Sequence, residues 1–476
     1  MRLLLLLVLL GPQTSQACPG VKTVVSSKGL DYVTNLVTDW VQKKILSADL
    51  PVISGSVDIG IGSVGYALYD MRVVKVDMPQ PSVNFVEKTG VRVELSGLSI
   101  AVEGRWRTSY GIIKDGGSFD LALFDVSTSS LLQLESDYQA RLAVECLSCD
   151  AQIGNVDINF HGGASFIIDV FVKFFPGRIK SLVEDHICPI VQDQVKNLEG
   201  ILAAIKVDYP VYPNLIFSVP LTNSPVVQSS GMELDSKGVF YSATHPKEPP
   251  FPSEDFQLPS EAGYMISMGI SQYSLNTYAY ACLTDGLFQI NITDKMIPPS
   301  VHFRLNTSSF GVFIPQLPKM FPNMLMVLQV FADEAPAVSL HMDSFSLLLT
   351  ATVKAYAIDN TTAYRPLFRL KLTTEFSGKL NIGNNTLMGN MQFQNLTLSL
   401  VTSQIGTFQT KTLEGTASFL VKSYLPKLNA MLQKGFPLPV AKGVTLAGPV
   451  LQVQQGFLAV YSNVQINLPS RTWEEL

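Results

Sequence analysis

Cations and aromatic rings alternate in one short segment of this chain, GRWRTSYGIIK at residues 104–114. At the tip of a β-hairpin, guanidinium and ammonium groups can bind phosphate while the aromatic rings contact acyl chains or sugars. The alternative is a solvated turn beside a packed tryptophan. The candidate phosphate-binding site comprises four residues: Arg105, Trp106, Arg107 and Lys114.

Other patterns that could carry chemistry lack the context that the chemistry needs. The string GIGSVG at residues 60–65 matches a dinucleotide fingerprint, but YALYDMRVVKV follows it and indicates a strand, where the fingerprint requires a helix. Five histidines accompany no HExxH or GxSxG motif, and His186 and Cys188 would point to different faces of a helix. We therefore expect no enzyme, no metal site and no nucleotide cofactor.

The ends and length of the chain suggest a secreted protein of two domains. Residues 1–17 hold Arg2, an apolar run from Leu3 to Leu10 and small residues before Cys18, which predicts a signal peptide cleaved after Ala17. The remainder exceeds the roughly 250–300 residues at which a single core stops growing. Apolar residues make up 47% and charged residues 15% of the chain. This composition is explained either by apolar surface that binds a ligand or by an ordinary large all-β core.

The five cysteines predict one important disulfide bridge. Either Cys146 or Cys149 can pair with Cys188, closing a loop worth about 4 kcal/mol in the chain-entropy model. Cys18 and Cys282 lie far from them and are candidates for free thiols.

Sugar acceptor motifs and charge divide the chain into unlike halves. From Cys18 to His245 there are 18 Lys and Arg against 25 Asp and Glu, whereas Pro246 onward has 15 against 14. The acidic first half argues against nucleic acid and against strong nonspecific capture by anionic membranes. Asn-X-Ser/Thr motifs, all in the second half, predict N-glycosylation. They are Asn291, Asn306, Asn360, Asn384 and Asn395.

Periodicity predicts helices and strands in a repeated order, typical of α+β domains. Residues 27–46 form an amphipathic helix with Ser26 or Ser27 as cap. Short alternating runs over 52–159, among them YQARLAVECL and AQIGNVDINF, indicate antiparallel strands. Residues 164–205 indicate two or three helices in series, interrupted by Pro176 and Pro189.

The segment 245–259 holds five prolines and predicts a linker between domains at 18–244 and 260–468, with a tail at 469–476. Beyond the linker the pattern predicts strands near 264–268 and 287–293, a helical piece around 310–321, strands over 327–401, a helix at 412–433 and closing strands.

Long colinear stretches of the chain resemble the bactericidal permeability-increasing and lipopolysaccharide-binding protein family. The stretches are PGVKTVVSSKGLDY, GRWRTSYGIIKD, CLSCD with a later CP, GVFYSATHPKEPPFP, MIPPSVHFRLNTSSFGVFIPQLPKMFPNM and LQKGFPLP. The resemblance implies an elongated two-domain molecule, each domain a twisted antiparallel β-barrel with long helices, joined by a central sheet. It also implies one apolar phospholipid pocket in each half, and it selects Cys149 with Cys188 as the disulfide.

The resemblance further implies a secreted innate-immune protein that binds the lipopolysaccharide (lipid A) of Gram-negative bacteria and phospholipid. Its expected partner surface is the bacterial outer membrane, it is expected to be a monomer, and no nucleic acid is expected to bind.

 The residues that match the family's basic positions are Arg105, Arg107 and Lys114, while Tyr110 and Gly111 stand where basic relatives carry cations. A carrier or transfer protein for phospholipid, with little affinity for lipopolysaccharide, is the alternative. A lipid hydrolase ranks last.

The stripe of the first helix supplies candidates for the wall of a lipid pocket, because an amphipathic helix must bury one face. A helix packed against a solid core is the alternative, and periodicity does not separate the two. The candidates are Leu30, Val33, Val37 and Trp40.

Overall fold

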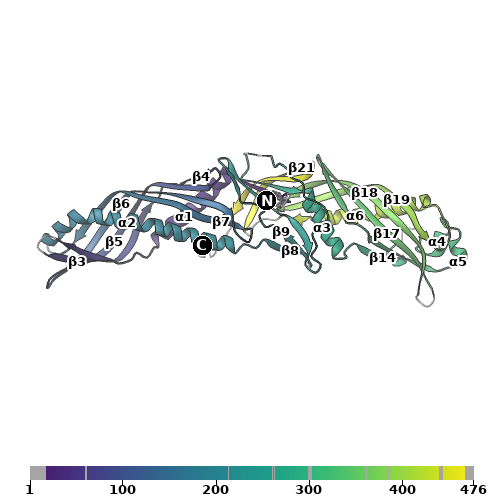
Figure 1. Cartoon of the computed structure of the whole chain (residues 1–476), viewed down its shortest axis with the longest axis horizontal. Helices are drawn as coiled ribbons and strands as arrows, with labels where there is room; N and C mark the ends of the chain where they lie inside the picture. The colour runs from purple at the N-terminus through teal and green to yellow at the C-terminus, as the bar shows by residue number, and fades with distance from the viewer. Residues whose placement is uncertain are drawn as a thin grey trace, which may run out of the picture.

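The protein is an elongated α+β molecule with two halves that meet at a central sheet (Figure 1). The computed structural model describes residues 18–58, 62–163, 165–212, 214–259, 261, 263–297, 303–359, 363–383, 385–438 and 443–466. The side chains of residues 165–174, Trp40, Tyr212 and Pro437 are outside that description. The predicted signal peptide and the predicted tail also lie outside the described residues.

The first helix, α1 (Ser27–Leu46), forms where the sequence predicts it. Ser26 is its N-cap, and the side chain of Ser26 accepts a hydrogen bond from the Gly29 N–H. Lys43 and Lys44 lie in the last turn, where cations interact favourably with the negative end of the helix dipole. The helix contacts β3 (Ser63–Asp77) and β4 (Ser82–Val86) of the first-half sheet.

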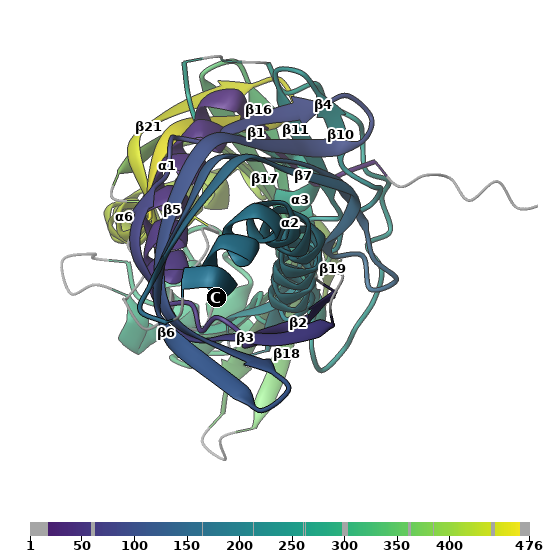
Figure 2. The ribbon, with the colours of Figure 1, turned by 90° about the vertical axis from the view of Figure 1, so that its left-hand side faces the viewer.

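The first half is built on an antiparallel sheet of long strands. Figure 2 looks along the molecule at this half and shows the sheet curling around α2 (Ser165–Ala203). The strand order is β2-β3-β5-β6-β7, with β4 paired to β5. The remaining bounds are β2 Ile53–Asp58, β5 Gly90–Tyr110, β6 Ile113–Ser136 and β7 Leu142–His161.

The strands of the first half are longer than the short runs that the sequence pattern predicts. Strand β7 continues through residues that the pattern splits into two runs, and β6 spans 24 residues. Register shifts between Leu95 and Leu98 and between Leu131 and Leu132 absorb the breaks in alternation. A β-bulge inserts a residue without ending the ladder, so a break in alternation need not end a strand.

Helix α2 is one continuous helix of 39 residues, so the prediction of two or three helices in series is wrong. Pro176 and Pro189 both lie inside it. An interior proline costs about 3 kcal/mol because it removes one backbone hydrogen bond and crowds the preceding turn. Burial of Phe175 and Ile179 against the sheet, on either side of Pro176, offsets that cost.

The central sheet is shared by strands from both ends of the chain. Its order is β10-β11-β1-β13-β22-β21, and all of its pairs are antiparallel. The first strand therefore lies between a strand of the first half and a strand of the second. The bounds are β1 Val21–Ser26, β10 Val226–Gln228, β11 Gly231–Ser236, β13 Ile266–Ser271, β21 Val444–Gln454 and β22 Phe457–Ile466.

The proline-rich segment 245–259 contains no helix or strand and runs against the central sheet. The Phe256 ring stacks on Phe457 with a centroid distance of 4.9 Å. Buried Lys22 lies 3.5 Å from the carboxylate of Asp255 and 3.0 Å from that of Glu233. These contacts attach the segment to β1 and β22.

The second half repeats the plan of the first with a different order of strands. Its sheet runs β14-β15-β17-β18-β19-β20, with β16 paired to β17, and α6 packs on β19. The strands are β14 Gln289–Thr293, β15 Leu325–Ala332, β16 Ala337–His341, β17 Ser344–Ile358, β18 Tyr364–Gly383, β19 Thr386–Ser403 and β20 Phe436–Pro437. The helices are α3 Gln272–Thr284, η1 Asp294–Met296, α4 Thr307–Phe310, α5 Leu317–Met320 and α6 Lys411–Lys434. A small third sheet joins β12 (Val239–Ser242), β9 (Leu215–Ser218) and β8 (Asp208–Tyr212) near the junction.

Helix α3 is absent from the sequence-based expectations. Its buried positions include Ser274, Thr277 and Ala281, which are small or polar. The Thr277 hydroxyl donates to the Ser274 carbonyl and accepts the Phe240 N–H, so this face is satisfied by hydrogen bonds. A hydrophobic stripe search cannot find a helix whose buried face is built this way.

Candidate functional site

The candidate cations lie on the β5–β6 hairpin, at its end remote from the central sheet. The near end is fixed because Val91 of β5 and Leu134 of β6 pack in a cluster with Val227 and Met232 of the central sheet. The far end turns through Gly111, whose φ of +57° suits a glycine. The tip of the hairpin is thus placed at the end of the first half.

Strand alternation separates the tryptophan from the cations. Arg105, Arg107 and Lys114 are exposed on the outer face, whereas Trp106 is 3% exposed on the inner face. The Trp106 ring meets the Phe160 ring edge-on with a centroid distance of 5.7 Å. The grouping of Trp106 with the three cations in one site is therefore corrected, because successive side chains of a strand point to opposite faces.

The three cations have no carboxylate partner within the described residues. Arg107 lies over the Tyr69 ring at 5.5 Å from its centroid, and no ion pair involves Arg105, Arg107 or Lys114 in that part of the chain. Other charged side chains on the same face have partners, since Arg72 pairs with Glu103 at 2.8 Å and His161 Nε2 lies 2.8 Å from Asp120. The tip therefore presents positive charge that a phosphate can meet.

Two isoleucines complete the tip and were missed in the sequence analysis. Ile112 is 100% exposed and Ile113 is 46% exposed. Both follow the turn glycine and precede Lys114. Apolar side chains next to cations suit an interface between lipid headgroups and acyl chains. The signal was the string GII at the predicted hairpin tip.

Three of the four candidates on α1 have described side chains, and these three differ in their surroundings. Leu30 packs in the cluster around Phe85, Val33 is 41% exposed and Val37 is partly buried. The Trp40 side chain lies outside the described residues. Leu30 therefore matches the alternative of a helix packed on a solid core.

An unfilled apolar face lies instead on α2. Ile179, Val183 and Ile187 follow one another at spacings of one turn and pack against the first-half core. Their stripe continues as Ile190, Leu198 and Ile201, which are 60%, 39% and 37% exposed. The same face is therefore exposed to solvent along the C-terminal part of the helix. The sequence analysis does not identify this face, because it predicts an interruption of the helix at Pro189.

Helix α6 presents a similar face in the second half. Leu420, Val421 and Leu425 pack into the core clusters there. Beside them, Tyr424, Leu428 and Met431 are 38%, 37% and 61% exposed at helical spacing. Each half therefore has one long helix with apolar side chains left uncovered.

The cavity beside Trp106 is too small for a lipid. It measures about 10 Å³ and is lined by Tyr66, Phe160 and Phe175 among others. The predicted pocket of each half stays a prediction, and in the first half the side chains of residues 165–174 of α2 lie outside the described part.

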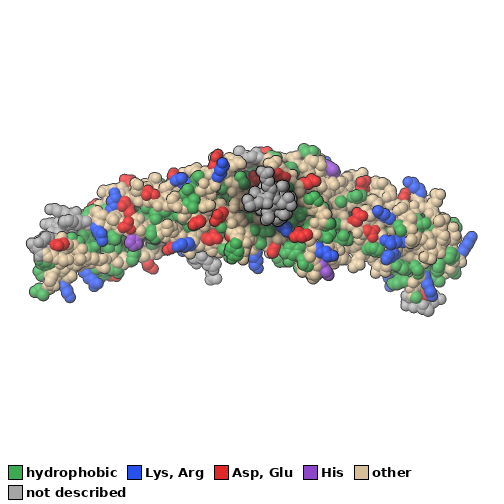
Figure 3. Space-filling model, in the orientation of Figure 1, with side chains coloured by type: hydrophobic (Ala, Val, Ile, Leu, Met, Phe, Trp, Pro, Cys, Tyr) green, Lys and Arg blue, Asp and Glu red, His purple; other side chains and the backbone are tan. Residues whose placement is uncertain are grey.

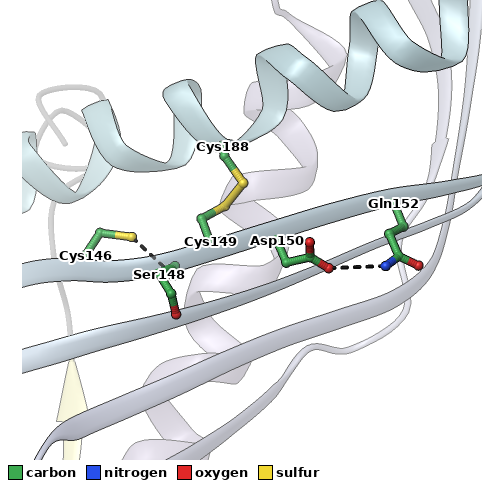
Figure 4. Close-up of a disulfide and its surroundings, with 6 residues drawn as sticks. All are labelled: Cys146, Ser148, Cys149, Asp150, Gln152 and Cys188. Carbon is green, nitrogen blue, oxygen red and sulfur yellow. Dashed lines mark hydrogen bonds between the residues drawn. A yellow bond between two sulfur atoms is a disulfide. The ribbon is translucent and has the colours of Figure 1, made fainter.

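The disulfide joins Cys149 of β7 to Cys188 of α2 (Figure 4), which is one of the two pairings the cysteine spacing left open. The bridge enters α2 one residue before Pro189 and holds the helix against the sheet. Cys146, Cys18 and Cys282 are free thiols. Burial raises the pKa of the Cys282 thiol, which makes it a poor nucleophile.

The predicted glycosylation positions stay predictions, with three of them in described segments. Asn291 and Asn395 are exposed on β14 and β19. Asn306 caps α4, and its side-chain oxygen accepts the Ser309 N–H at 2.7 Å. Asn360 and Asn384 lie outside the described residues.

The part of the chain that the structure describes brings together no group of three or more His, Cys, Asp or Glu side chains able to hold a metal ion. Among the same residues, no helix combines the length and apolar character that a bilayer crossing needs.

Comparison with known proteins covers almost the whole chain. The family model described as LBP / BPI / CETP family, N-terminal domain, matches residues 29–198, and the C-terminal domain model of that family matches residues 215–466. A bactericidal permeability-increasing protein of Sebastes schlegelii is 34% identical, over 97% of this chain and 98% of that protein. The human lipopolysaccharide-binding protein is 28% identical over 97% of each chain. A crystal structure of lipopolysaccharide binding protein superposes with a TM-score of 0.63 at 25% identity, covering 95% of this chain and 100% of that one.

Proposed function

This chain belongs to the LBP / BPI / CETP family, whose members are lipid-binding and transfer proteins rather than enzymes, and from that premise we propose a specific function for it. It is a secreted innate-immune protein that binds the lipid A part of lipopolysaccharide at the surface of Gram-negative bacteria. It also binds phospholipid in apolar pockets, and it acts as a monomer.

The observation that carries this proposal is the tip of the β5–β6 hairpin. Arg105, Arg107 and Lys114 are exposed and without carboxylate partners among the described residues, next to the exposed Ile112. Guanidinium groups bind phosphate through two parallel N–H donors. The tip can thus hold the phosphates of lipid A while Ile112 meets the adjoining acyl chains.

Acyl chains would supply most of the affinity. Transfer of each CH₂ from water to an apolar site contributes about 0.8 kcal/mol. The uncovered face of α2, with Ile190, Leu198 and Ile201, offers such a site in the first half. Tyr424, Leu428 and Met431 of α6 offer one in the second half.

A phospholipid carrier with little affinity for lipopolysaccharide is the second candidate function. It is favoured by the excess of acidic residues before His245, 25 against 18 basic residues, since this charge opposes binding to an anionic surface. The uncovered faces of α2 and α6 would suffice for such a carrier. The two candidates differ in whether cations at the tip matter.

Replacing both tip arginines, Arg105→Ala/Arg107→Ala, is expected to weaken binding to immobilised lipopolysaccharide by about tenfold to a hundredfold. Each guanidinium would donate charge-assisted hydrogen bonds to phosphate, and salt screens such contacts when they are exposed. Surface plasmon resonance across a salt series measures both effects. Binding of the wild type should weaken with salt more steeply than that of the variant.

Arg72→Ala is the matched control for the tip arginines. Arg72 lies on the same outer face but pairs with Glu103 at 2.8 Å, so its removal should leave binding within about twofold. Equal losses in the control and the double variant would point to total charge rather than to the tip. If the double variant binds lipopolysaccharide as the wild type does, the carrier function replaces the proposed one.

Introducing charge on α2, Leu198→Asp/Ile201→Asp, is expected to reduce uptake of phosphatidylcholine by at least about tenfold, because an unpaired carboxylate is costly in an apolar site. The control is Gln192→Asp, an exposed position on the opposite side of the same helix. Uptake of a fluorescent phosphatidylcholine from vesicles measures the effect. Unchanged uptake in the double variant would exclude this face as the acyl-chain site.

A further inference from the structure

Two cations face each other across neighbouring strands in the second half. Lys354 of β17 is the direct register partner of Arg369 of β18. Both point to the outer face, because their neighbours Val353, Ala355 and Leu370 are buried in the core. Like charges directly opposite each other destabilise a sheet. A negatively charged group near Lys354 and Arg369 would therefore relieve their repulsion.

The strands around this pair are opened by two β-bulges. One register shift falls between Ala355 and Tyr356 where β17 meets β18, and another falls between Arg369 and Leu370 where β18 meets β19. A cavity of about 150 Å³ lies there, far more than the roughly 15 Å³ that one water requires. Its lining consists of Lys354, Ala355, Tyr356, Pro366, Leu367, Phe368, Arg369, Thr402 and Gln404. Bulges of this kind occur next to binding sites, where they redirect side chains.

Neighbouring groups hold the two cations in place without neutralising them. The Lys354 ammonium lies over the Phe331 ring at 4.9 Å from its centroid. An Arg369 Nη donates to the Thr352 hydroxyl at 3.2 Å, and that hydroxyl donates to Asp333 at 2.7 Å. The ordered positions reduce the entropy lost when a ligand binds.

One hydrogen-bond donor of Arg369, the Nε–H, is buried and has no acceptor among the described residues. No ion pair within that part of the chain involves Lys354 or Arg369, and the nearby Asp359 carboxylate is engaged by Arg365 at 3.0 Å. Figure 3 shows Lys and Arg side chains, in blue, over the region that Figure 1 labels β17. The Arg369 guanidinium therefore keeps hydrogen-bonding capacity that no acceptor in the described residues uses.

We propose that the cavity between β17, β18 and β19 binds a phosphate-type oxyanion. The Arg369 guanidinium and the Lys354 ammonium would contact its oxygens, and Thr402 and Gln404 line the same cavity. Arginine offers planar paired donors and lysine a point charge, a combination that suits a tetrahedral anion. The site lies in the half opposite the hairpin tip, so it is independent of the function proposed above.

Calorimetric titration of the full chain with sodium pyrophosphate, at ionic strength held constant with sodium chloride, tests the site. The wild type should bind, and Lys354→Gln/Arg369→Gln should lose about tenfold or more in affinity. Lys371→Gln is the matched control, since Lys371 is an exposed cation on β18 that does not line the cavity. It should bind within about twofold of the wild type.

Thermal unfolding distinguishes a ligand site from a purely structural role. Pyrophosphate should raise the Tm of the wild type and leave that of the double variant unchanged. Without the anion, the double variant should unfold at or above the Tm of the wild type, because the repulsion is gone. A wild-type Tm that does not respond to pyrophosphate, or equal binding by the double variant, overturns the proposal.

Vesicles distinguish a lipid headgroup from a free phosphate as the source of the oxyanion. Phosphatidylcholine vesicles containing phosphatidic acid are sedimented with the wild type, the double variant and Lys371→Gln. Greater loss of sedimentation in the double variant than in Lys371→Gln supports the site with a headgroup as its ligand. Equal sedimentation of all three, together with selective pyrophosphate binding, supports the site with a soluble phosphate ester.

Discussion

Cys149→Ser is expected to lower the free energy of unfolding of the first half by about 4 kcal/mol in the chain-entropy model. The bridge to Cys188 spans a sequence separation of 39 and fixes α2 on β7, so its loss enlarges the unfolded ensemble. It also frees α2 near Pro189, where the helix already lacks one backbone hydrogen bond. Urea denaturation followed by circular dichroism measures the change.

Cys146→Ser is the matched control for the disulfide. Cys146 lies on the same strand and is a free thiol whose Sγ donates a hydrogen bond to the Ser148 carbonyl at 3.5 Å (Figure 4). Its replacement should change the free energy of unfolding by less than about 0.5 kcal/mol. No loss in Cys149→Ser would show that the bridge does not stabilise the first half. An equally large loss in the control would show that replacing a cysteine on β7, rather than breaking the bridge, causes the effect.

Trp106→Ala is expected to lower the free energy of unfolding by about 3–5 kcal/mol, the range for truncating a buried aromatic ring. Trp106 is 3% exposed and packs against Phe160, and its Nε1–H donates to the His161 carbonyl at 3.4 Å. Its removal would leave a cavity and an unpaired carbonyl. The same denaturation experiment measures the loss.

The affinity of folded Trp106→Ala for lipopolysaccharide should stay close to that of the wild type, because the ring faces away from the cations. Arg107→Ala should behave in the opposite way, with weaker binding and a nearly unchanged free energy of unfolding. Should Trp106→Ala keep its stability and lose binding, the ring would belong to the binding site after all.

Local rules succeeded where the sequence carried a regular pattern with clear ends. The helix at residues 27–46 has a capping serine, an apolar stripe and lysines in its last turn, and the structure has it at the same residues. The predicted helix at 412–433 is likewise α6, Lys411–Lys434. The elongated two-domain α+β architecture came from resemblance to a family, and the match to a solved relative confirms it.

Several features of the structure depend on tertiary packing and are not predicted by the sequence pattern. The two prolines of α2 predict breaks in the helix, yet the helix is continuous because Phe175 and Ile179, on either side of Pro176, are buried. Strand alternation by itself predicts that Trp106 lies on the face opposite Arg105 and Arg107, because successive side chains of a strand point to opposite faces. The cavity at Lys354 and Arg369 depends on two bulges and on pairing between strands, which the sequence does not display.

The placement of β1 in the central sheet has a consequence for how the protein is made. Val21 of β1 pairs with Ile270 of β13, and Ile270 pairs in turn with Leu458 of β22. During synthesis, the first strand to emerge must therefore wait for partners that emerge much later, and the last pair closes only near the end of the chain. Contacts so distant in sequence form slowly and leave an open strand edge exposed in the meantime. The nascent chain is thus vulnerable to mispairing until its final strands leave the ribosome.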